Sequence, residues 1–134
     1  MIVLPKHLYD ALRRNGEAYA RESCDLVPVV KFFDPCGAAT WLISRLDLEE
    51  PDILYGLCDL GLGFPELGPV RFSELAAVKG RLGIGLERDL WFAPTFPISV
   101  YAAAAHRAQR IVEDDDSLMR AASHLPVPGK SPRQ

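Results

Sequence analysis

Apolar and polar positions in the first part of the chain follow a helical period. The pattern predicts a helix over residues 5–14 with three leucines on one face: Leu4, Leu8 and Leu12. Pro5 suits the first helical position, because its missing N–H is one that a helix leaves unpaired there. Asn15 and Gly16 predict the helix end, since both accept left-handed backbone. Residues 17–25 show no clear period and predict a loop or frayed turn.

Three stretches rich in branched and aromatic residues then predict strands, over residues 27–33, 39–46 and 53–58. The first two are separated by a type I turn from Asp34 to Gly37, with Asp first, Pro second and Gly fourth. The third stretch is nearly all apolar, which favours a central position in a sheet. Short connections between the three predict an antiparallel meander.

The second half of the chain carries weaker signals. They predict a short strand over residues 69–72, a short helix from Ser73 to Gly80, a strand over 89–92, and a helix from 97 or 99 to 112. The fold class is therefore α+β. A four- to five-stranded, mostly antiparallel sheet would pack with an N-terminal helix, a short middle helix and a C-terminal helix.

The C-terminal residues differ from the rest in character. An acidic run, Asp114-Asp115-Asp116, is followed by a segment with three prolines and few apolar residues. We predict a single domain over residues 1–112 and a disordered or loosely attached tail over 113–134.

Composition narrows the function classes. The chain has 134 residues and a formal net charge of −3, which argues against a general nucleic-acid binder and against a DNA mimic. A DNA-binding alternative would need a basic face built from six cations: Arg13, Arg14, Lys31, Arg45, Lys79 and Arg81. The sequence contains no run of 18 apolar residues, so it predicts no membrane span.

The cysteines and the N-terminus predict a cytoplasmic protein. Cys24, Cys36 and Cys58 are odd in number, widely spaced and without a C-x-x-C pair, so reduced thiols with structural roles are expected. The apolar start of the chain is too short for a secretory signal.

The glycine-rich segment over residues 59–68 is the first candidate for chemistry. It lacks the third glycine of a dinucleotide loop and the Lys-Ser/Thr ending of a P-loop, so a tight turn is the favoured interpretation. Asp59 and Glu66 flank this turn. As an alternative, they could converge to hold a metal ion or nucleotide, or to perform acid/base catalysis.

A second polar segment, Glu87-Arg88-Asp89, predicts either local ion pairs or a polar site beside the 59–68 loop. The chain has three histidines, His7, His106 and His124, but no zinc-hydrolase spacing. No motif predicts a cofactor or a metal site.

Five segments together resemble a known family: Val27–Lys31, Ala39–Leu42, Gly56–Gly61, Gly63–Gly68 and Glu87–Leu90. The resemblance is to the domain-of-unknown-function 2958 family, small bacterial proteins often encoded on conjugative plasmids and integrative elements. It covers about residues 4–112.

The resemblance carries over no catalytic residue, but it marks a candidate functional surface on the motif residues Asp59, Phe64, Glu66, Arg88 and Asp89. It implies a non-enzymatic accessory protein of a mobile element, acting in plasmid upkeep, transfer or defence evasion. Such a protein would act by binding another protein of unknown identity.

Overall fold

The computed structural model describes residues 2–125, and its centre is an antiparallel sheet. Five strands follow the spatial order β4-β3-β2-β1-β5. Their bounds are β1 (Val30–Phe33), β2 (Thr40–Leu46), β3 (Ile53–Asp59), β4 (Glu66–Arg71) and β5 (Glu87–Arg88). The predicted α+β fold with a four- to five-stranded, mostly antiparallel sheet is confirmed, and the sheet has five strands, all antiparallel.

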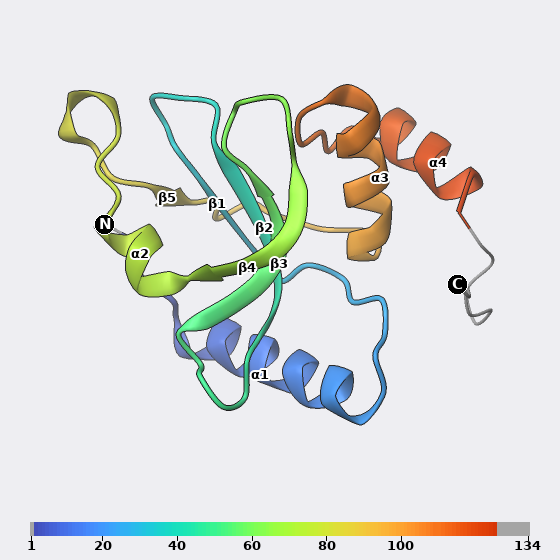
Figure 1. Cartoon of the computed structure of the whole chain (residues 1–134), viewed down its shortest axis with the longest axis horizontal. Coiled ribbons are helices and arrows are strands. Elements are labelled where there is room, and N and C mark those ends of the chain that lie inside the picture. Colours follow the sequence, from blue (N-terminus) through green and yellow to red (C-terminus); the bar gives the residue numbers. More distant parts are fainter. Residues whose placement is uncertain (1, 126–134) are drawn as a thin grey trace.

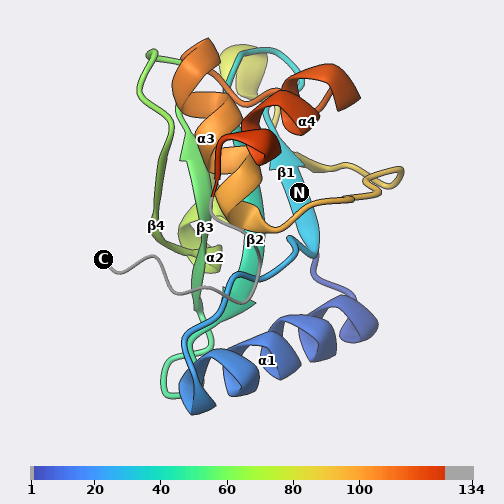
Figure 2. The same cartoon turned by 90° about the vertical axis from the view of Figure 1, so that its right-hand side faces the viewer.

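Helices cover the sheet at different places. They are α1 (Lys6–Arg21), α2 (Phe72–Ala77), α3 (Ile98–Ala108) and α4 (Asp115–Ser123), with a short 3-10 turn, η1 (Arg81–Gly83). Figures 1 and 2 show α1 crossing one end of the strands, while α3 and α4 lie together beside the other end. The β3–β4 hairpin loop and the β1–β2 turn also lie at the end far from α1 (Figure 1).

Each face of the sheet buries its own core, because successive strand residues point to opposite faces. On one face, Trp41 and Ile43 pack with Leu12 of α1 and Leu75 of α2. The other face packs against α3 and α4 through a separate cluster: Leu42, Leu57, Val100, Tyr101, Ala104, Ala105, Val112, Leu118 and Ala121. The small alanines let α3 lie close to the sheet.

The first helix is longer than predicted, because its predicted stop packs against β2. Asn15 Nδ2 donates to the Ser44 carbonyl oxygen at 2.8 Å, and Gly16 is buried inside the helix. A Cβ atom on Gly16 would lie 2.5 Å from the Leu46 carbonyl oxygen. The prediction of a loop or frayed turn over residues 17–25 is wrong for 17–21, because Gly16 permits close helix–strand packing instead of ending the helix, while residues 22–25 lie outside any helix or strand.

Three later elements are shifted from their predicted bounds. β4 begins at Glu66 rather than at 69, and β5 is Glu87–Arg88, while residues 89–92 lie in a turn. Ser73 does not cap α2. Its hydroxyl and N–H donate to the Asp52 carboxylate at 2.7 and 3.0 Å, and these bonds lower the pKa of Asp52.

Residues 115–123 form α4, which corrects the prediction of an unstructured tail for this segment. Asp114 caps the helix, because its side chain accepts a hydrogen bond from the Ser117 N–H at 2.9 Å, and this bond lowers the pKa of Asp114. Leu118 and Ala121 of α4 are buried in the same cluster as the apolar residues of α3. Residues 126–134 of the predicted tail lie outside the described residues.

The strand β4 forms one edge of the sheet and carries a proline, Pro69. The Phe72 N–H bonds to the Asp52 carbonyl oxygen, and bonded and unbonded positions alternate along an antiparallel ladder. The backbone groups of Leu67, Pro69 and Arg71 therefore face the open edge. Pro69 loses no ladder bond there and removes a donor that an added strand would need.

Within residues 2–125, no helix has both the length and the apolar character needed to cross a membrane.

We predict that Gly16→Ala destabilises the protein by about 1–3 kcal/mol, because the new methyl group must displace the β2 backbone. Helix propensity alone predicts the opposite sign, a gain of up to about 1 kcal/mol. Urea unfolding measures the difference. Gly68→Ala is the control, since nothing lies within 4 Å of its Cβ position. Increased stability of Gly16→Ala would contradict the close contact.

Candidate functional site

Asp59 ends β3 and is almost completely buried, with 2% of its surface exposed. One carboxylate oxygen accepts the Gly61 N–H at 2.8 Å, and the other accepts the Ile111 N–H at 2.9 Å. The side chain thus ties the β3–β4 hairpin to the segment between α3 and α4. Both oxygens are engaged with backbone donors, so this carboxylate is built as a structural brace.

Glu66 lies on the other face of the sheet from Asp59. Glu66 pairs in register with Cys58, whose side chain packs against the core that α1 and α2 cover. The Glu66 side chain is itself exposed. Asp59 instead reaches Ile111 on the α3–α4 side. The two carboxylates therefore do not converge. Among residues 2–125, no three His, Cys, Asp or Glu side chains are grouped to hold a metal ion.

The Arg88–Asp89 segment does not meet the 59–68 loop. Register matches place Glu87, Phe33, Thr40 and Asp59 in one row across four strands. Three strand spacings separate the ends of that row by about 14 Å. The candidate residues therefore form no single site.

Arg88 and Asp89 also face opposite sides of the sheet. Arg88 pairs with Phe32 of the α1–α2 core. Asp89 lies near the Lys31 ammonium, at 3.4 Å, and Lys31 also donates to Glu113 at 2.6 Å. This ion-pair network of three residues links β1, the residue after β5 and the residue before the Asp114 cap of α4, and within residues 2–125 no ion pair joins Glu87, Arg88 and Asp89 to one another.

The six cations of the DNA-binding alternative are used in different ways. Lys31 is paired with two carboxylates, Arg13 lies 3.8 Å from Glu17, and the Arg45 guanidinium stacks on Tyr19. These contacts take three of the six cations away from a common basic face.

Phe64 is the candidate residue most available for contact, with 78% of its surface exposed. Three leucines of the same hairpin are also more than half exposed: Leu60 at 62%, Leu62 at 73% and Leu67 at 55%. We call these four residues the hairpin patch. Phe64 is one of the predicted site residues and the three leucines are not, although the alternation of Leu60 and Leu62 with glycines in a turn is a signal of exposed apolar side chains.

A second set of exposed apolar residues flanks β5, at the opposite sheet edge. It comprises Leu82, Ile84, Leu90 and Trp91, and Trp91 is 90% exposed. The sequence pattern predicts a strand over residues 89–92, which includes Trp91. The Asp89 carboxylate instead accepts the Trp91 N–H at 2.9 Å, which folds the chain into a turn and turns the indole outward.

The three free cysteines differ in environment. Cys24 is exposed, Cys36 is half-buried, and burial raises the pKa of the Cys58 thiol to about 11. The predicted structural role suits Cys58, whereas the exposure of Cys24 does not favour a structural role for that thiol.

We predict that Asp59→Asn lowers the unfolding free energy by about 1–3 kcal/mol, because one backbone N–H then faces an amide NH2 group instead of an oxygen. Glu66→Gln is the matched control and should change stability by less than about 0.5 kcal/mol, since Glu66 is exposed. Chemical denaturation compares the two variants. Equal stabilities would contradict the assignment of Asp59 as a brace.

We predict that iodoacetamide at pH 8 modifies Cys24 at least tenfold faster than Cys58. A pKa near 11 leaves roughly 0.1% of the Cys58 thiol as thiolate at this pH, and Cys58 is partly buried, whereas Cys24 is exposed to the reagent. Peptide mass spectrometry resolves the sites, and the unfolded protein is the control in which both react alike. Comparable rates in the folded protein would show that Cys58 is not shielded.

The chain matches the sequence profile of a known protein family. The sequence profile described as a protein of unknown function (DUF2958) matches residues 3–112, which include β1 to β5 and α3. Searches of curated proteins and of solved structures each returned no match. Since the profile spans most of the 134 residues, the chain belongs to the DUF2958 family of proteins of unknown function.

Proposed function

We propose that this protein is a non-enzymatic accessory protein that acts by binding another protein through its hairpin patch. The observation that carries the proposal is the patch itself: Leu60, Leu62, Phe64 and Leu67 each expose more than half of their surface. Clustered apolar side chains in water are costly, and such clusters commonly mark protein-binding sites.

The rigidity of the hairpin supports the proposal. Gly61 and Gly63 adopt φ of 83° and 90°, and Asp59 holds the Gly61 N–H. A Cβ atom on Gly61 would lie 3.0 Å from the Ala38 Cβ, so the loop rests against the β1–β2 turn. A preorganised apolar surface loses little conformational entropy on binding, which favours recognition.

The surroundings of the patch suggest the chemistry of the partner. Glu66 is an exposed acid on the same hairpin as the four apolar side chains, whereas Asp59 is buried and internally bonded. A partner with an apolar pocket and a basic rim would fit. The family resemblance suggests the setting, a bacterial mobile element, with plasmid upkeep, transfer or defence evasion as the process served.

Catalysis has less support. An enzyme built on Asp59 and Glu66 would need both carboxylates in one pocket, and they lie on opposite faces of the sheet. A cytoplasmic location suits a protein that meets its partner inside the bacterial cell.

The test begins with a photocrosslinking residue, p-benzoylphenylalanine, placed at position 64 or, as a control, at position 91. Irradiation of bacteria carrying the host element should give a partner band from position 64 only. Purified partner then allows calorimetric titration. We expect Leu62→Ser and Phe64→Ser to weaken binding at least tenfold, about 1.4 kcal/mol, and Trp91→Ser to change it less than twofold.

Two results would contradict the proposal. One is crosslinking from position 91 but not from 64. The other is a partner affinity that falls with Trp91→Ser and is unchanged by both hairpin variants. Unfolding free energies of the three variants should match that of the parent protein, because all three side chains are exposed.

A further inference from the structure

The Arg45 side chain near the end of β2 is held between two aromatic rings. Its guanidinium carbon lies 3.7 Å from the centroid of the Tyr19 ring and 3.9 Å from that of the Tyr55 ring. We propose that Arg45 binds the carboxylate of a small zwitterionic ligand, of the amino-acid class, in the hollow between α1 and the β2–β3 connection.

The stacked arrangement leaves only the edge of the guanidinium for hydrogen bonding. Two rings within 4 Å cover both faces, and the N–H groups of a guanidinium all lie in its plane. Within residues 2–125, no carboxylate lies within 4 Å of Arg45 and no acceptor is bonded to it. Lys31, the other partly buried cation described above, has two carboxylate partners.

A hollow of about 180 Å³ adjoins Arg45. Residues of α1 and of the chain after β2 line it: Gly16, Tyr19, Ala20, Arg45, Leu46, Asp47, Leu48 and Glu49. This space holds several water molecules and therefore has room for a small organic ion. A planar carboxylate matches the two parallel N–H groups along a guanidinium edge.

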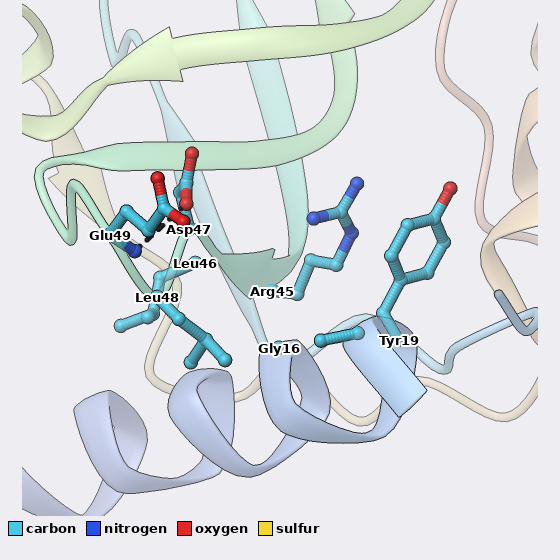
Figure 3. A pocket seen from close by; sticks show the side chains of 8 residues that line it. Gly16, Tyr19, Arg45, Leu46, Asp47, Leu48 and Glu49 are labelled. Atoms are coloured by element: carbon cyan, nitrogen blue, oxygen red, sulfur yellow. Dashed lines mark hydrogen bonds between the residues drawn. The ribbon is translucent and has the colours of Figure 1, made fainter. Parts of the chain in front are cut away.

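Two acids give the hollow a second pole. Figure 3 shows Arg45 beside Tyr19 on one side and the carboxylates of Asp47 and Glu49 on the other. They disfavour a doubly charged phosphate and favour a ligand that carries a cationic group next to its carboxylate. An α-amino acid has this pair of charges, and glycine is its smallest example.

The hollow lies beside α1, whereas the hairpin patch lies at the opposite end of the sheet (Figure 1). This inference therefore does not depend on the proposed protein partner, and either one can fail without the other.

The test uses the full chain labelled with 15N and follows the Arg45 Nε–H signal during titration with glycine, acetate or inorganic phosphate. Sodium chloride keeps the ionic strength constant and serves as the blank. We expect saturable shifts of the Arg45 signal with glycine and acetate. Glycine should bind at least threefold more tightly than acetate, and phosphate should bind most weakly.

Variants separate ligand binding from a purely structural stack. Arg45→Lys keeps the positive charge but loses the planar guanidinium with its two parallel N–H groups. Leu48 lines the hollow, so its amide signal should shift with glycine in the parent protein, and this shift should disappear in Arg45→Lys. Arg81→Lys, on the exposed η1 turn, should leave it unchanged. Glu49→Gln should reduce the preference for glycine over acetate.

Shifts that rise linearly with every salt, or that match those of chloride, would overturn the proposal. Saturable binding of phosphate without binding of glycine or acetate would overturn the assignment of a carboxylate ligand.

Discussion

The buried carboxylate of Asp59 accepts hydrogen bonds from two backbone N–H groups that lie far apart in the sequence, that of Gly61 in the hairpin and that of Ile111 after α3. A buried carboxylate is costly unless its oxygens are hydrogen-bonded, so the two contacts form a mutually dependent set. They align the exposed hairpin on one side and the start of the α4 segment on the other. The hairpin patch and the α3–α4 core both take their positions from this brace.

The same sheet separates residues that are close in sequence. Side chains alternate between faces, so Asp59 and Glu66 lie on opposite faces of the sheet even though they flank one turn. The available surfaces then divide by chemistry, with apolar side chains at the hairpin end and a charged, aromatic hollow beside α1. Pro69 on the β4 edge makes side-chain contact at the hairpin a better binding mode than strand addition.

Much of the fold could be predicted because the strands carry strong local patterns. The antiparallel meander, the Asp34–Gly37 turn and the internal position of β3 follow from branched residues and turn chemistry. Helix ends were harder to predict. Gly16 reads locally as a stop, but its role depends on the Leu46 carbonyl oxygen thirty residues away. Likewise, α4 has only nine residues, and its apolar face is evident only against α3.

The central claim is that Asp59 is a structural brace that holds the hairpin for contact, and amide hydrogen exchange tests it most directly. Gly61 is exposed, yet its N–H donates to a buried carboxylate. If Asp59 holds both segments, the Gly61 and Ile111 amides exchange at least tenfold more slowly than the Leu62 amide in the same loop. Exchange of Gly61 and Ile111 as fast as that of Leu62 would show that Asp59 does not hold the hairpin.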